Sequence, residues 1–313
     1  MVLDLTPVQR RTLQDLVDVG EGAPFDPSLE ARLRERIERG IVGFVPPKPV
    51  RLWKERLNDL ARCEGLFGAA MAGEGEPFRY GPRAARGTLV HKAIEMEIGG
   101  SRVRDAHQVA ARAAFGLEED RQFGPYWDGL DEFDRDGLLM SAVQTLESFR
   151  ASFPPVPEVW RSLAPVCEHW MEAGFAGGRV TVTGKVDLML NRPQPNRATR
   201  VLVDLKSGRA WPDHPEDMRL YALLYTLRFG VPPFRVATLF LTSGQPQAEL
   251  VTEEGLEHAA ARVIGSVRAM AGLAGGRLPD LRPGPYCPWC PRKEACPALA
   301  KAERGRREEA APM

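Results

Sequence analysis

The chain has no net charge and little lysine. Its 313 residues carry 42 Lys and Arg against 42 Asp and Glu, so overall charge gives no argument for a polyanionic partner. Only seven of these cations are lysines, and 35 are arginines. The planar guanidinium group of arginine suits phosphate binding, but a GC-rich genome would produce the same excess, so both explanations stay open.

Long apolar runs are also absent from the sequence. No uncharged stretch approaches the length of about 18 residues that a membrane-spanning helix needs, and no basic-then-apolar leader opens the chain. We therefore expect a cytoplasmic globular protein, with enough apolar residues (43%) for a sizeable core.

Cysteine is scarce, and its number is odd. In a chain without a secretion signal, this argues against a disulfide framework and for metal ligation or isolated buried thiols. The five cysteines are Cys63, Cys167, Cys287, Cys290 and Cys296.

The first third of the chain is predicted to be mostly helical. The pairs Thr6-Pro7 and Asp26-Pro27 are typical of helix starts, so residues 1–50 are expected to form a helical N-terminal extension and linker. The main domain is expected at 51–300, with a helical insertion at about 100–150, and 301–313 is expected to be a charged flexible tail. Apolar spacing predicts helices at about 53–72, 85–98 and 137–150.

The second half predicts strands and helices in alternation. Strands are expected at 164–174, 178–190, 201–206, 234–244 and 246–252, and helices at about 213–229 and 253–273. This order predicts an α/β fold with a central mixed β-sheet flanked by helices.

The stretch "VLVDLKSGRA" (201–210) ends an apolar strand with an acid and a lysine on one face. Side chains two residues apart project together from a strand, so Asp204 and Lys206 point the same way. Asp187, in the preceding strand "GKVDLML", can reach the same edge of the sheet. Two carboxylates so close repel each other unless a cation lies between them, and Mg²⁺ or Mn²⁺ suits such oxygen ligands.

Upstream, "RGTLVHKAIEMEI" places His91 and Glu95 on one helical face, and Gly87 allows a close approach of the helix start. The preceding stretch "RYGPRAARG" (79–87) contains no acid, and its arginines are candidate DNA-phosphate contacts. They are Arg79, Arg83 and Arg86.

Together these motifs resemble the RecB-like branch of the PD-(D/E)XK nucleases. The likeness rests on Gly87-x-x-x-His91, then Gly184-Lys185-Val186-Asp187, then Asp204-Leu205-Lys206, in that order. It implies a restriction-endonuclease-like core in which His91, Asp187, Asp204 and the carbonyl of Leu205 bind Mg²⁺ or Mn²⁺, while Lys206 orients or deprotonates the attacking water.

One element departs from the family pattern. RecB-like enzymes commonly continue with Q-x-x-x-Y on a helix, and this chain has Asp217 and Tyr221 at that spacing. A carboxylate cannot donate the hydrogen bonds of an amide, so the role of the glutamine is not assigned to Asp217. Tyr221 remains a candidate catalytic residue, and packing against the sheet is the alternative.

The sequence "CPWCPRKEAC" supplies three thiols, and Cys63 is the expected fourth ligand. Cys167 is the weaker candidate, because it lies inside an expected strand. This set resembles the iron-sulfur staple of RecB-like nucleases, including AddB-type nucleases and CRISPR-associated exonucleases. The likeness implies a 4Fe-4S cluster on Cys63, Cys287, Cys290 and Cys296, with Zn²⁺ as the alternative. Cys167 is interpreted as a small buried apolar residue.

We therefore expect a metal-dependent DNA nuclease, an exonuclease on single-stranded DNA or duplex ends, working in recombination, repair or foreign-DNA processing. A helicase, a repair protein or a CRISPR protein is a possible partner. The alternatives are a CRISPR-adaptation nuclease, a non-catalytic DNA-binding or adaptor protein on a nuclease fold, and a zinc-stabilised binding protein.

Overall fold

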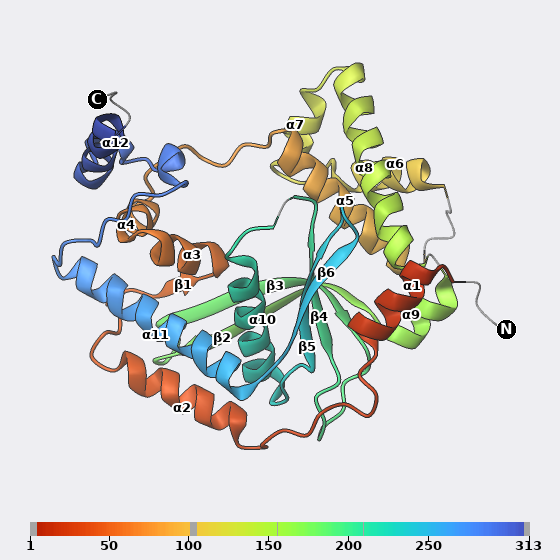
Figure 1. The fold of residues 1–313 in the computed structure, drawn as a ribbon, viewed down its shortest axis with the longest axis horizontal. Coiled ribbons are helices and arrows are strands. Elements are labelled where there is room, and N and C mark those ends of the chain that lie inside the picture. The colour runs from red at the N-terminus through yellow and green to blue at the C-terminus, as the bar shows by residue number, and fades with distance from the viewer. Residues whose placement is uncertain (1–4, 101–104, 155, 209, 310–313) are drawn as a thin grey trace. The chain divides into compact units, whose positions relative to one another are not determined.

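The structure is a computed structural model that describes residues 5–100, 105–154, 156–208 and 210–309 (Figure 1). The chain divides into two compact units. The first unit contains Met1–Glu30, Phe78–Met171 and Lys185–Leu256, and the second contains Ala31–Pro77, Glu172–Gly184 and Glu257–Met313.

A mixed sheet forms the centre of the first unit. β3 (Val180–Leu190) and β4 (Val201–Lys206) are antiparallel, with Leu188 opposite Val203. β5 (Arg235–Phe240) runs parallel to β4, and β6 (Gln245–Leu250) is antiparallel to β5. β2 (Val166–Phe175) also pairs with β3. The expected α/β fold class is therefore confirmed.

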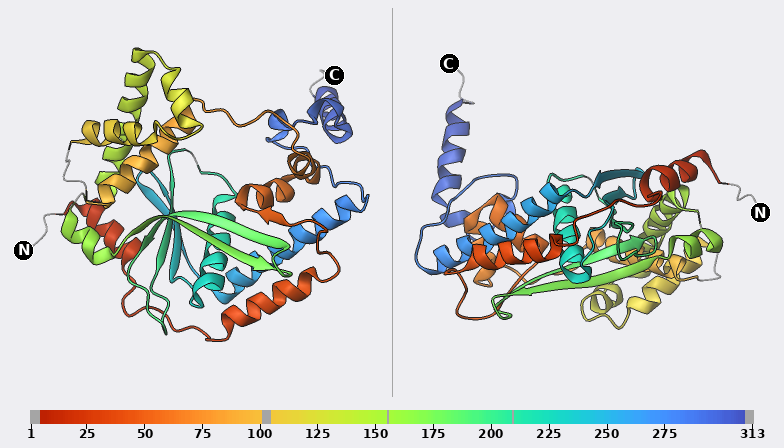
Figure 2. Two further views of the ribbon diagram at one scale, coloured as in Figure 1. Left: turned by 180° about the vertical axis from the view of Figure 1, so that it is seen from behind. Right: turned by 90° about the horizontal axis from the view of Figure 1, so that it is seen from below.

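Three helices, α5, α6 and α8, lie side by side in the first unit (Figures 1 and 2). Their apolar faces share a core with one face of β4, which contributes Val201, Val203 and Leu205. α10 packs against β4 and β5. Because side chains alternate along a strand, Asp204 and Lys206 project from the β4 face opposite to Leu205. The bounds of these helices are α5 (Pro82–Ile98), α6 (Ala106–Leu117), α8 (Glu132–Ser152) and α10 (His214–Phe229).

The N-terminal extension begins as its cap predicts. The Thr6 hydroxyl accepts a hydrogen bond from the Gln9 amide, and the Gln9 side chain accepts one from the Thr6 amide, which closes a capping box on α1. The smaller elements of the first unit are α1 (Pro7–Arg11), the π-helix η1 (Thr12–Val17), α7 (Phe123–Asp128) and α9 (Pro157–Leu163).

Between Ala31 and Pro77, the second unit differs from the sequence prediction in two places. The helix expected at 53–72 is two helices, α3 (Lys54–Arg62) and α4 (Glu64–Met71), because Cys63 between them has an extended backbone with φ −164°. The proline-rich connection contains a short strand, β1 (Val50–Leu52), which pairs in parallel with β3 at Val180.

The C-terminal part of the second unit is largely helical. Residues 301–309, expected as part of a flexible tail, belong to α12. Among the described residues, no helix combines the length and apolar character that a membrane span requires. The elements are α12 (Pro297–Glu309) and the 3-10 helices η2 (Cys287–Trp289) and η3 (Lys293–Ala295), while α2 (Leu29–Ile41) and α11 (Glu253–Ala274) have residues in both units.

Candidate active site and cysteine pocket

The candidate active site lies where β3 and β4 separate. Their paired register ends at Leu188 and Val203. Past the last paired residues, the Leu205 amide donates a 2.6 Å hydrogen bond to Asp187 Oδ2. A side-chain oxygen of β3 thus accepts the bond in place of a backbone carbonyl. The Asp187 side chain is only 9% exposed. The strand end therefore holds this carboxylate against the peptide of Leu205.

His91 reaches the same peptide from α5. Its Nε2 lies 2.9 Å from the Leu205 carbonyl oxygen, and its Nδ1 lies 3.4 Å from Asp187 Oδ1. Three of the expected metal ligands, the imidazole, one carboxylate and the backbone carbonyl, are thus neighbours in space although α5 is far from both strands in sequence.

Glu168 of β2 joins this group, which the sequence analysis did not anticipate. Its Oε1 lies 3.7 Å from His91 Nδ1, and one ligand atom from each of His91, Glu168 and Asp187 lies within 4.8 Å of the others. The other Glu168 oxygen forms an ion pair with Lys185. Glu168 has φ +51°, a left-handed backbone that costs a non-glycine residue about 1–3 kcal/mol. Such strain is typical of functional sites.

Asp204 and Lys206 form a close pair on one face of β4, as the alternation predicts. Asp204 Oδ2 lies 2.5 Å from Lys206 Nζ. The Asp204 side chain is 3% exposed, whereas that of Lys206 is 23% exposed. The buried carboxylate therefore holds an ammonium group that remains accessible from solvent.

Electrostatic coupling is strong around His91. Burial lowers the pKa of the imidazole, but the adjacent carboxylates of Asp187 and Glu168 outweigh burial and raise the pKa to about 10. Burial raises the pKa of Glu168, and contacts with His91 and Lys185 lower it by more. The neighbouring Cys167 thiol has its pKa raised to about 12 by burial and then by nearby carboxylates. This thiol is therefore protonated at neutral pH.

The candidate phosphate-binding arginines have different surroundings. Arg86 donates through Nη2 to the Ser207 carbonyl at 2.9 Å, so its guanidinium braces the loop that follows Lys206. Arg79 and Arg83 are exposed. Asp217 and Tyr221 are buried in α10, with 5% and 2% exposure.

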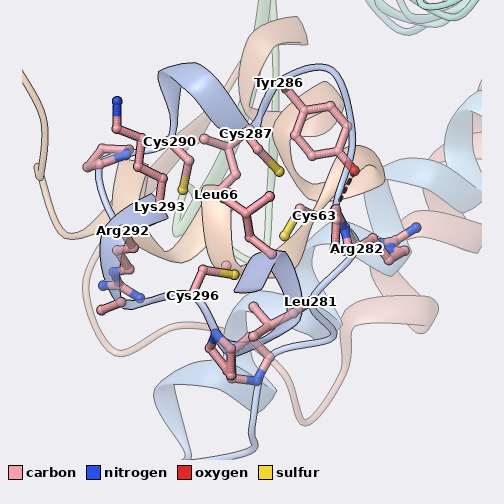
Figure 3. Close-up of a pocket in the computed structure, with 17 residues that line it drawn as sticks. Cys63, Leu66, Leu281, Arg282, Tyr286, Cys287, Cys290, Arg292, Lys293 and Cys296 are labelled. Carbon is pink, nitrogen blue, oxygen red and sulfur yellow. Dashed lines mark hydrogen bonds between the residues drawn. The ribbon is translucent and has the colours of Figure 1, made fainter. Parts of the chain in front are cut away.

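Four of the five cysteines line one pocket of about 400 Å³ in the second unit. Figure 3 shows the side chains of Cys63, Cys287, Cys290 and Cys296 lining this pocket, with the Leu66 side chain drawn among their sulfur atoms. The Gly284 amide donates to Cys287 Sγ at 3.2 Å. Cys167 does not line this pocket; its side chain packs against the main core of the first unit.

Across the described residues, no three of the cysteine sulfurs all lie within 4.8 Å of one another. The four thiols thus share a pocket without forming a compact group.

Comparison with known proteins identifies the family. The profile of the PD-(D/E)XK nuclease superfamily matches residues 54–297, which is most of the chain. The chain belongs to the PD-(D/E)XK nuclease superfamily. No curated protein matches it.

Two solved structures resemble this superfamily member at low identity. One is the crystal structure of a proposed exonuclease from Eubacterium rectale, with 14% identity, 88% of this chain and 90% of that chain covered, and a TM-score of 0.44. The other is the crystal structure of SSO0001, with 12% identity, 86% and 96% covered, and a TM-score of 0.33.

The superfamily motifs did not point to Glu168 and Lys185 as a pair. A charged residue inside the mostly apolar strand "APVCEHWMEAG" was the available signal for Glu168. Lys185 was visible only as part of the Gly184–Asp187 motif. Their contact depends on the pairing of β2 with β3, which the sequence pattern does not specify.

Proposed function

We propose that this protein is a divalent-metal-dependent deoxyribonuclease that acts as an exonuclease on single-stranded DNA or duplex ends. The observation that carries the proposal is the convergence of His91 and Asp187 on the peptide of Leu205, beside the Asp204 and Lys206 pair. Membership of the nuclease superfamily supports a nucleic acid as the substrate. Recombination, repair or foreign-DNA processing are the processes that use such an activity.

The donor atoms fit a hard divalent cation. In this proposal Mg²⁺ or Mn²⁺ is held by His91, Asp187, Asp204 and the Leu205 carbonyl, and Glu168 adds a further oxygen donor. When bound, the cation lowers the pKa of a coordinated water and screens the charge of the phosphodiester.

The protein residues provide orientation and charge. Asp187 keeps its position through the hydrogen bond from the Leu205 amide, so its free oxygen faces His91. Lys206, held by Asp204, presents an ammonium group that orients the attacking water and stabilises the negative charge that develops on the phosphate. Tyr221 is 2% exposed, so its role in the proposal is to support α10 against the sheet.

The hydrolytic proposal is tested with labelled single-stranded DNA. The protein is purified without oxygen and incubated with Mg²⁺ or Mn²⁺, beside an Asp204→Ala variant and an EDTA control. We expect metal-dependent cleavage that the variant lacks. Equal cleavage by the variant would show that the site is assigned wrongly, and no cleavage by the parent would favour a non-catalytic DNA-binding protein.

We also propose that the cysteine pocket holds a 4Fe-4S cluster. Four thiols from two segments of the second unit line one pocket of about 400 Å³, and four thiolates are the ligand set of such a cluster. The amide of Gly284 points at Cys287 Sγ, as a donor to a thiolate would. The cluster would join the break between α3 and α4, at Cys63, to the C-terminal segment of the second unit.

Colour and metal content test the cluster. Anaerobically purified protein is expected to be brown and to contain about four irons per chain. Cys63→Ser is expected to lose iron, and Cys167→Ser, outside the pocket, is the matched control that retains it. A colourless protein containing one zinc would refute the cluster without affecting the hydrolytic proposal.

A further inference from the structure

An exposed aromatic side chain precedes the helix that carries His91. Phe78 is 57% exposed, and its ring packs against Tyr80 at 5.0 Å in an edge-to-face arrangement. Tyr80 is itself fixed, because its ring contacts the buried Phe123 at 5.6 Å and its hydroxyl lies 3.1 Å from the Thr88 hydroxyl. Tyr80 thus connects the Phe78 ring to the core, while more than half of the Phe78 residue stays exposed to solvent.

The segment that follows Phe78 carries positive charge, whereas Glu76 stands two residues before it. The sequence from Pro77 to Ile94 contains no acidic residue. Arg79 and Arg83 are exposed, and neither forms an ion pair within the described part of the chain. The first turn of α5 also lacks an acid. Arg79 and Arg83 therefore offer two accessible cationic groups to a chain of phosphates.

One face of α5 leads from Arg83 to the candidate active site. Arg83, Gly87 and His91 follow one another at intervals of four residues, so they share a face of the helix. Gly87 lets the loop after β4 approach that face closely, because a Cβ there would lie 3.4 Å from the Ser207 hydroxyl. The helix rises about 14 Å from Pro82 to His91. A few nucleotides of one strand cover this length.

From these observations we propose that Phe78, with Arg79 and Arg83, forms a binding subsite for single-stranded DNA. An unpaired base stacks on the Phe78 ring, and the adjoining phosphates contact the two arginines and continue along α5 towards His91. A base inside a duplex does not expose its face to such a ring, so the subsite selects unpaired strands. This inference rests on the proposed nuclease function, since it names the form of DNA that the site receives.

The test measures binding and not hydrolysis. Fluorescence anisotropy follows a labelled oligothymidylate and a blunt duplex in EDTA, at fixed salt, with the Asp204→Ala protein as the parent. Phe78→Ala is expected to weaken single-strand binding about 5- to 100-fold and to leave duplex binding unchanged. Phe78→Tyr retains a ring and is expected to bind like the parent, whereas Phe78→Leu, apolar without a ring, is expected to bind like Phe78→Ala.

Two further variants complete the test. Phe229→Ala removes another exposed phenylalanine, on α10, and is expected to bind like the parent. Arg83→Gln removes one expected phosphate contact. It should therefore reduce the slope of log affinity against log salt concentration by about one. Unchanged single-strand affinity in Phe78→Ala, or an equal loss for the duplex, would overturn the inference. Failure of the nuclease function would appear separately, as DNA binding without metal-dependent cleavage.

Discussion

Removing the charge of Asp187 is expected to lower the pKa of His91 in the metal-free protein. The two neighbouring carboxylates overcome burial and raise this pKa from 6.5 to about 10. The difference corresponds to roughly 5 kcal/mol, an upper bound because 26% of the imidazole side chain is exposed. Asp187→Asn removes the larger carboxylate contribution but keeps an oxygen for the Leu205 amide. We expect the pKa of His91 to fall, because burial then opposes a smaller carboxylate contribution.

The protonation of His91 makes fold stability and metal affinity depend on pH in opposite directions. Because the folded-state pKa is raised, the protonated imidazole stabilises the metal-free fold fully below pH 6.5, and this stabilisation is lost as the pH rises through about 10. A metal ligand must be the neutral imidazole, so Mn²⁺ binding below pH 10 releases a proton and the apparent affinity rises with pH.

Proton NMR of the metal-free protein measures this pKa directly. The chain has five histidines, and the His91→Gln spectrum identifies the resonance that belongs to His91. Asp131→Asn, which changes an exposed cap of α8, is the control and should leave that resonance unchanged. The reasoning is refuted if His91 titrates near 6.5 in the parent, or if Asp187→Asn leaves its titration unchanged.

Three further predictions concern contacts of the first unit. Glu168→Gln should weaken Mn²⁺ binding about 10- to 100-fold by calorimetry; unchanged affinity would contradict its place as a donor. Arg86→Gln should slow cleavage about 10- to 100-fold without weakening DNA binding, since Arg86 holds the Ser207 carbonyl; weaker binding with normal cleavage would make it a DNA contact. Glu97→Ala should cost about 3 kcal/mol in urea unfolding, because Arg150 loses its 2.9 Å buried partner; a change below about 1 kcal/mol would contradict this.

Local sequence patterns determined much of the fold and part of the site. The alternation in "VLVDLK" placed Asp204 and Lys206 together, and the structure shows that pair. The Thr6-Pro7 start formed the expected cap. Such features depend on residues a few positions apart, whose relative geometry follows from backbone periodicity alone.

Local patterns were insufficient where a single residue interrupts an element. The apolar spacing of 53–72 predicted one helix, because leucines continue at helical intervals on both sides of Cys63. The extended backbone at Cys63 divides that segment into α3 and α4. In this conformation Cys63 lines the pocket of the three C-terminal cysteines.

By itself, the sequence determined which chemical groups the protein has, and in what order: an imidazole, carboxylates, a lysine and four thiols at spacings typical of one nuclease family. Only the tertiary structure decided which groups meet. Glu168 and Lys185 became part of the site through the pairing of β2 with β3, and Arg86 became a brace for the Ser207 carbonyl. The reason is physical: contacts between residues far apart in the chain depend on strand pairing and helix packing, which involve the whole core at once.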